Sequence, residues 1–453
     1  MITEHEIQSA RHCISYALEH GASAARAALN KSSLDSCNLL NGELDKVTHS
    51  TDRSIYLYLY VDGRYGTFST NRFETDELES FIRNAIEMVK MLGEDACRRL
   101  PEPSREAADA KTGRELGLYD ESISRSDSES RLSKIGQMTI YGRLTPEGCT
   151  IISEECEYSE SYDDSFLIDS QGFEGRHTES SYNCFTEITV QDPDGNKYSG
   201  YWWDAANQDN SIQLKECSMK ALERAASQIG PKPRKSGRYR MVVDTSAATR
   251  LLSPLLNALN GSALQQKMSF LDGTLGSRVF PEDMTLMDMP REYGRSGARM
   301  YDSEGVATAN APVIENGVVK RYFINTYNAA KMDMTPTVED ISRPYMKPFM
   351  KGKALQDTEK EVSLKDILQL CGNGILVTGF NGGNSNPVTG DFSFGIEGFA
   401  FSKGKITHPV REMLITGNLM ELWNSLIAAG SDMRQSVRWQ IGSLAFENVS
   451  FSA

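Results

Sequence analysis

The chain has 453 residues, of which 39% are hydrophobic and 24% charged, and its formal net charge is −14. These values are typical of a soluble globular protein with two or three domains. The acidic balance argues against non-specific binding to nucleic acid, and no apolar run approaches the length of a membrane span.

The N-terminus lacks the basic and apolar segments of a secretory leader. The eight cysteines are scattered and never form Cys-x-x-Cys. This pattern predicts reduced thiols in a cytoplasmic protein, because disulfide frameworks and zinc ribbons use regular cysteine spacings.

The first predicted domain, an α/β domain, covers residues 1–104. Thr3 and Glu6 have the spacing of a capping box at the start of an apolar-striped helix. Residues 55–61 alternate between aliphatic and tyrosine side chains before an Asp-Gly turn, which predicts a hairpin. A second helix is expected from about Thr75 to Gly93.

A Pro-Glu-Pro-Ser linker then leads to a middle α+β domain over residues 112–230. We expect a helix near residues 126–138, strands over 149–204 and a helix over 211–229. A second linker, rich in glycine, proline and lysine, precedes the C-terminal domain.

The third predicted domain covers residues 237–453 and is rich in β structure. It begins with a strand at 239–243, followed by a leucine-rich helical segment that contains Pro254. Because proline in a helix interior costs about 3 kcal/mol, we expect Ser253 as N-cap and Pro254 at the first helical position. An Asn-Gly hairpin follows at 316–317, and a late helix is expected over 418–429. The predicted fold class is α+β.

The most informative segment covers residues 371–417, which hold ten of the 36 glycines between strand-like apolar runs. Glycine is favoured where a backbone must take positive φ or lie close to another chain. The segment therefore predicts tightly turned β structure with exposed backbone, suited to binding an extended peptide.

Residues 389–395, Thr-Gly-Asp-Phe-Ser-Phe-Gly, followed by Glu397-Gly398, resemble the C-terminal signature of the TldD/PmbA family, often labelled modulator of DNA gyrase. Segments 269–276 and 301–308 agree with the same family. The resemblance covers residues 240–450 closely and the front half more loosely. On this basis, the residues expected to bind substrate are Asn384, Thr389, Asp391, Ser393 and Glu397.

TldD-type members resemble zinc peptidases, with His-Glu-x-x-x-His on a helix and a cysteine near the C-terminus. In this chain, Ser253 and Pro254 stand where the first His-Glu would fall, and Ala258 stands where the second His would fall. No cysteine follows Cys371. This is the PmbA/TldE pattern, and it implies no catalytic residue and no metal or other cofactor in this chain, with zinc supplied by a TldD-like partner.

The resemblance implies a non-catalytic subunit of a TldD/TldE-type metalloprotease that acts on unfolded or small polypeptides. The expected partners are a TldD-like zinc subunit or a second copy in a dimer, and an extended polypeptide, with no direct nucleic-acid or membrane contact. Two alternatives are a regulator of DNA gyrase acting through protein contacts, and a homodimeric hydrolase that uses Asp391, Ser393 or Glu397.

Several other patterns have both a structural and a functional interpretation. Six acids between Glu154 and Asp164 form either a solvated face or a surface for a basic partner. Asp302 and Glu304 form either a solvated turn or an acid–base pair. The aromatic run 201–203 forms either core or an interface anchor. His5-Glu6 with His12 is read as a capped surface helix, and His408 as structural.

Overall fold

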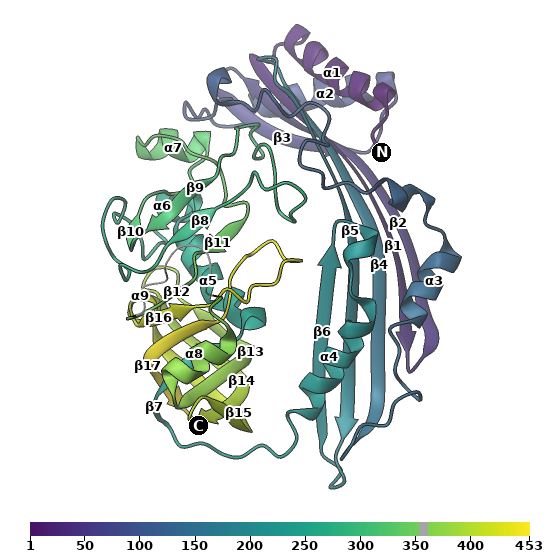
Figure 1. Ribbon diagram of the computed structural model, residues 1–453. Helices are drawn as coiled ribbons and strands as arrows, with labels where there is room; N and C mark the ends of the chain where they lie inside the picture. Colours follow the sequence, from purple (N-terminus) through teal and green to yellow (C-terminus); the bar gives the residue numbers. More distant parts are fainter. Residues whose placement is uncertain (353–360) are drawn as a thin grey trace. The chain divides into compact units, whose positions relative to one another are not determined.

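The computed structural model describes residues 1–352 and 361–453, which form two compact units (Figure 1). Unit 1 consists of Met1–Ala226 and Arg291–Thr308, and unit 2 consists of Ser227–Pro290 and Ala309–Ala453. Both units combine helices with sheets, and unit 2 contains eleven of the seventeen strands in the described residues. The predicted α+β class is confirmed.

Unit 1 is built on a six-stranded antiparallel sheet of order β3-β2-β1-β4-β5-β6. Its strands are β1 Ala24–Leu40, β2 Glu43–Val61, β3 Arg64–Thr70, β4 Thr150–Asp169, β5 Glu174–Gln191 and β6 Lys197–Ala206. Its helices are α1 Glu4–Glu19, α2 Thr75–Lys90, α3 Ser128–Gly136 and α4 Leu214–Ala226.

All four helices of unit 1 cover the same face of this sheet. Ala27 and Leu29 of β1 pack in the core under α1 and α2, and Cys37 and Leu39 pack in the core under α3 and α4. These four residues are at odd positions, and alternate residues of a strand share one face. The predicted capping box of α1 is present, with Thr3 and Glu6 bonding reciprocally.

Strand β1 joins the residues of the first two predicted domains. It pairs with β2 on one side and, over residues 26–40, with β4 on the other. The middle of β1 is polar, so apolar and polar residues alternate only weakly along it. The sequence pattern therefore did not predict β1 as a strand. Residues 1–104 and 112–230 therefore share one sheet, and the predicted boundaries between them stay a prediction.

Residues 291–308 complete unit 1 although they lie far along the chain. Arg26 Nη1 donates to the carbonyl of Ser303 at 3.0 Å. The rings of Phe173 and Tyr301 meet edge to face, with centroids 5.5 Å apart, in a small core that covers part of the second face of the sheet.

Unit 2 contains a barrel. Strand β7 pairs in parallel with β13 and antiparallel with β17, which closes β7, β13, β14, β15 and β17 into a ring. The bounds are β7 Gly237–Val243, β13 Gly374–Ser385, β14 Asp391–Ser402, β15 Lys405–Asn418 and β17 Leu444–Ser452, with β12 Phe349–Met350 and β16 Leu426–Ala429 extending the sheet.

A second sheet in unit 2 has the order β10-β9-β8-β11. Its strands are β8 Leu286–Asp288, β9 Ala311–Glu315, β10 Val318–Val319 and β11 Pro344–Met346. The predicted turn between β9 and β10 is confirmed, with positive φ at Asn316 and Gly317. The helices of unit 2 are α5 Thr245–Ala258, α6 Gly261–Gln265, α7 Thr326–Met332, α8 Leu364–Cys371 and α9 Leu419–Asn424.

Two predictions for unit 2 were wrong in detail. Helix α5 begins earlier than expected, because Asp244 is its N-cap and accepts from the Ser246 backbone N–H at 2.9 Å. Pro254 is therefore inside the helix, where it cannot donate to the carbonyl four residues earlier. The expected late helix is a short α9, and residues 426–429 pair with β17 as strand β16.

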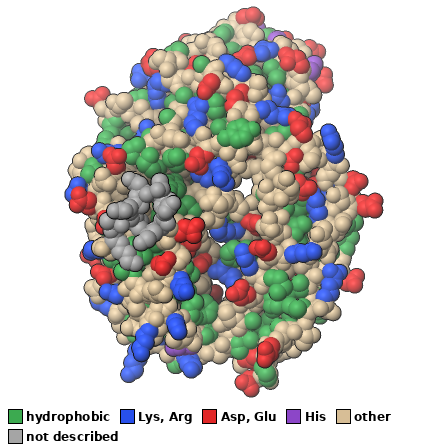
Figure 2. Space-filling model, in the orientation of Figure 1, with side chains coloured by type: hydrophobic (Ala, Val, Ile, Leu, Met, Phe, Trp, Pro, Cys, Tyr) green, Lys and Arg blue, Asp and Glu red, His purple; other side chains and the backbone are tan. Residues whose placement is uncertain are grey.

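No helix among the described residues is long and apolar enough to cross a membrane. On the face in Figure 2, acidic and basic side chains are interspersed despite the net charge of −14. All eight cysteines are free thiols, and seven of them are buried.

Candidate functional site

The residues expected to bind substrate lie together on strands β13 and β14 and in the turn that joins them. Asn384 of β13 is directly opposite Ser393 of β14. Asp391, Ser393 and Glu397 are exposed and at odd positions of β14, so they follow one face of the strand. Thr389 is in the turn, beside Asp391.

The Asp391 carboxylate holds this turn. Thr389 Oγ1 donates to Oδ2 at 2.7 Å, and Asn418 Nδ2 donates to Oδ1 at 3.0 Å and to the Thr389 carbonyl at 2.8 Å. The hydrogen bonds from Asn418 and then Thr389 lower the pKa of Asp391 below its ordinary value. Asp391 is thus an ionised acceptor whose oxygens are already bonded, which does not favour a role as the base for Ser393.

Glu397 is bonded across the hairpin. Asn381 Nδ2 donates to Glu397 Oε1 at 3.2 Å. Arg250 of α5 donates to the Gly383 carbonyl at 3.0 Å, and its guanidinium lies 5.1 Å from the centre of the Phe394 ring. Sequence reasoning missed Asn381, Asn418 and Arg250, because each acts on a residue far from it in the chain and none belongs to a short motif.

Glycines in this hairpin permit close approach of the two strands. A Cβ atom at Gly383 would lie 2.0 Å from the Ser393 carbonyl oxygen, and one at Gly395 would lie 2.2 Å from that of Asn381. The register shifts between Val377 and Gly379 and between Asn381 and Asn384. These two glycines are therefore explained by packing within the sheet.

The outer edge of β13 is open beyond its first residues. Strand β7 pairs with β13 only at Ile375–Val377, because the chain then turns into α5, where the Asp244 N–H donates to the Val377 carbonyl at 2.9 Å. Over residues 379–385, β14 is the only neighbouring strand in the described part of the chain. An open strand edge of this kind can pair with an extended peptide through main-chain hydrogen bonds.

Helix α5 packs beside this edge and carries the positions of the missing zinc motif. Ser253 and Pro254 are half-buried and Ala258 is buried. The Ala258 carbonyl accepts from Ser269 Oγ at 2.5 Å. None of the three side chains can supply a nitrogen ligand to a metal.

Metal ligands are not clustered in the described ranges, 1–352 and 361–453, where no group of three or more His, Cys, Asp and Glu side chains could hold a metal ion. His12 Nε2 is 3.2 Å from Glu79, and His49 Nδ1 is 2.9 Å from Asp35. Burial, with Lys232 and Arg234 nearby, lowers the pKa of His408.

The acidic run in β4 is half buried, which neither interpretation predicted. Glu154, Glu160 and Asp164 are at most 2% exposed, because they point toward the helices. Glu160 accepts from Lys134 at 2.9 Å, and Glu154 accepts from the Ile140 N–H at 2.9 Å. Only the alternate positions of the run face away from the helices.

Asp302 and Glu304 form a turn, as expected, but the turn is buried rather than solvated. Asp302 Oδ1 accepts from the N–H groups of Glu304 and Val306 at 2.9 and 3.0 Å. The two side chains are 5% and 8% exposed in unit 1. The carboxylate of Asp302 holds the turn, and this geometry gives no support to an acid–base pair.

The aromatic run in β6 is partly exposed. Tyr201 and Trp203 are 55% and 39% exposed, so they are not core residues. Trp202 faces the helices instead and lies about 5 Å from the charged groups of Lys220 and Arg224.

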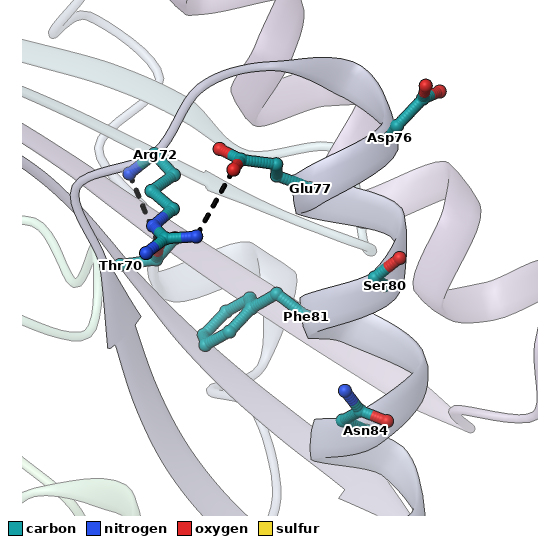
Figure 3. Close-up of a pocket in the computed structure, with 7 residues that line it drawn as sticks. All are labelled: Thr70, Arg72, Asp76, Glu77, Ser80, Phe81 and Asn84. Carbon is teal, nitrogen blue, oxygen red and sulfur yellow. Dashed lines mark hydrogen bonds and ion pairs between the residues drawn. The ribbon is translucent and has the colours of Figure 1, made fainter.

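A separate open groove of about 500 Å³ lies between the end of β3 and α2 (Figure 3). Arg72 reaches across it and donates to Glu77 at 3.1 Å. Arg72 and Glu77 thus satisfy each other across the groove, and nothing in it points to a ligand.

Comparison with known proteins agrees with the sequence signature. Three family models match: PmbA/TldA metallopeptidase domain 1 at residues 25–89, the central domain at 121–229 and the C-terminal domain at 236–453. A solved structure from Bacteroides thetaiotaomicron, described as a proposed modulator of DNA gyrase, is 40% identical over 100% of both chains, with a TM-score of 0.93. This chain belongs to the PmbA/TldD family.

More distant relatives share this assignment. The metalloprotease PmbA homolog of Haemophilus influenzae is 25% identical over 98% of this chain and 96% of its own length. The metalloprotease PmbA of Escherichia coli O157:H7 is 22% identical over 93% of this chain and 90% of its own. TldE from Thermococcus kodakarensis shares the fold, with a TM-score of 0.80 at 20% identity over 98% of this chain and 100% of that chain.

Proposed function

We propose that this PmbA/TldD-family chain is a non-catalytic, cytoplasmic subunit of a TldD/TldE-type metalloprotease that cleaves unfolded or small polypeptides. A TldD-like partner supplies zinc, and this chain contributes a strand edge for the polypeptide. One observation carries the proposal: helix α5 has Ser253, Pro254 and Ala258 at the motif positions, while β13 beside it keeps an open edge.

The open edge suits a substrate without a fixed sequence. Main-chain pairing provides affinity for any extended segment. Exposed side chains such as those of Asn384, Ser393 and Glu397 then raise or lower this affinity for particular peptides. Most strands of a folded protein are already paired or protected at their edges, so the edge favours unfolded or short polypeptides.

The test is to purify the chain by itself and together with a TldD-like subunit, and to measure mass, zinc content and cleavage of a denatured protein. We expect cleavage only by the complex, with zinc bound to the partner, and loss of activity with chelator. Stoichiometric zinc and metal-dependent cleavage in the isolated chain would refute the proposal.

A second candidate function is modulation of DNA gyrase, which the description of the Bacteroides structure favours. The net charge of −14 favours an effect through protein contacts rather than DNA. Pull-down of gyrase subunits by the purified chain tests this function, and failure to recover them counts against it.

A further inference from the structure

Strand β2 has a long exposed edge in unit 1. Strand β3 pairs only with Ile55–Val61, so in the described residues the earlier part of β2 has a strand partner only on the β1 side (Figure 1). Residues 43–53 are exposed apart from half-buried Thr48, and Val47 is 57% exposed. An exposed strand edge of this kind is a template for pairing with another chain.

The direction of the backbone groups along β2 follows from its neighbours. The Tyr60 carbonyl accepts from the Ser23 N–H on the β1 side, and Val61 and Arg64 flank a two-residue turn, so they bond to each other. Successive residues of an antiparallel strand bond to opposite sides. No register shift occurs between Lys46 and Val61, so the odd residues Val47, His49 and Thr51 direct their N–H and C=O groups to the open edge.

The charges along this edge are self-complementary. Residues 47–51 contain no Lys, Arg, Asp or Glu and include the strand-favouring Val47, Thr48 and Thr51, and they lie between Lys46 and Asp52. When two copies pair antiparallel about His49, Lys46 of each copy lies opposite Asp52 of the other, and Val47 lies opposite Thr51. This register also pairs odd residues with odd residues, as the backbone requires. A parallel, in-register pairing would instead place like charges side by side, which is unfavourable.

The remaining neighbours permit this register. The His49 ring is bonded to Asp35 of its own β1 strand, so the two central histidines do not need each other as partners. The next register shift in β2 falls just before Lys46, which makes Asp45 the extra residue of a bulge and ends the regular edge there.

We propose that β2 pairs antiparallel, about a two-fold axis at His49, with β2 of a second copy of this chain, so that the two six-stranded sheets become one continuous sheet. The partner at this edge is a second copy of the chain, because the charge pattern of β2 is complementary to itself. Pairing of this edge with a TldD-like subunit is the alternative outcome of the test. This inference does not depend on the proposed proteolytic function.

The test is a charge exchange followed by sedimentation over a range of chain concentrations. Lys46→Asp and Asp52→Lys each place like charges opposite each other in a homodimer, and we expect each to weaken dimerisation at least about tenfold. An equimolar mixture of the two variants restores both opposite-charge pairs, so we expect dimers in the mixture at wild-type strength. Lys197→Asp, at the other edge of the same sheet, is the matched control and should leave dimerisation unchanged.

Circular dichroism and thermal unfolding of each variant check that the fold is intact. A wild-type chain that stays monomeric, a mixture that dimerises no better than its components, or a dimer equally weakened by Lys197→Asp would overturn the proposal. An edge that pairs only with an added TldD-like subunit would also overturn it, while leaving the zinc-dependent cleavage of the proposed function intact.

Discussion

The Nη2 atom of Arg176 lies 2.6 Å from Oδ2 of Asp164, a side chain with no exposed surface. Asp164 also accepts from the Ile2 N–H at 2.7 Å, so the pair ties the N-terminus to β4 and β5. Arg176→Met leaves a buried carboxylate without its counter-charge. We expect a loss of about 3–5 kcal/mol in the free energy of unfolding, measured with denaturant.

The control for this prediction is Arg72→Met. Arg72 pairs with Glu77, and both side chains are well exposed. Its loss should cost at most about 1 kcal/mol. Equal effects of the two substitutions would show that burial of the Asp164 carboxylate does not matter.

Acid stability should depend on Glu6. Burial raises its pKa, but hydrogen bonds from Thr3 and Lys31 outweigh that effect and lower the pKa from its ordinary 4.5 to about 2. A carboxylate with a depressed folded-state pKa stabilises the protein fully above its unfolded pKa, and this contribution is lost as pH falls toward about 2. Between pH 5 and pH 2, roughly that window, the melting temperature of Glu6→Gln should fall less than that of the wild type.

Glu4→Gln is the matched control, because the Glu4 side chain is 71% exposed. It should follow the wild-type pH profile. If Glu6→Gln and the wild type lose stability in parallel, the ion pair with Lys31 does not contribute to folding.

Glycine at 395 should be required for packing. Gly395→Ala brings a methyl group into the Asn381 backbone and should destabilise unit 2 by about 1–3 kcal/mol. Gly379→Ala, in the paired strand, meets nothing closer than 3.7 Å and serves as the control. Thermal unfolding of both variants separates a steric cause from a general intolerance of alanine.

Thiol labelling should distinguish Cys97 from the other seven cysteines. Cys97 is the only one that is not buried. Burial raises the pKa of Cys13 and Cys156 to about 12 and that of Cys371 to about 11, which suppresses the reactive thiolate. We expect one fast-reacting thiol per native chain with a disulfide reagent, and all eight in denaturant. Several fast thiols in the native chain would contradict the described core.

Side chains on β14 should affect substrate binding in the complex with a TldD-like subunit. Ser393→Ala removes an exposed hydroxyl group and Glu397→Gln removes an exposed negative charge near the open edge, so we expect a higher KM for a peptide with little change in kcat. Ser402→Ala, exposed at the other end of the same strand, should change neither value. Equal KM values for all three variants would show that this face of β14 does not contact the substrate.

Local elements were predictable where short-range chemistry decides them. The Thr3–Glu6 capping box and the Asn316-Gly317 turn depend on neighbouring residues, and both are present. The buried acids of β4 were not predictable, because their partners Lys134 and Arg176 come from other elements. The turned β structure of residues 371–417 was predicted from its glycines and apolar runs, but the contacts of Arg250 and Asn418 were not, because they arise only when the barrel closes.

Residues 291–308 lie within the sequence of the C-terminal family domain, yet they pack with unit 1. A fragment cut after residue 230 would lack Met300 and Tyr301 beside Phe173 and would leave that apolar surface open to water. We therefore expect that a first half separated at the linker would not complete its fold, because it needs a stretch of chain that is translated only after the first barrel strand, β7.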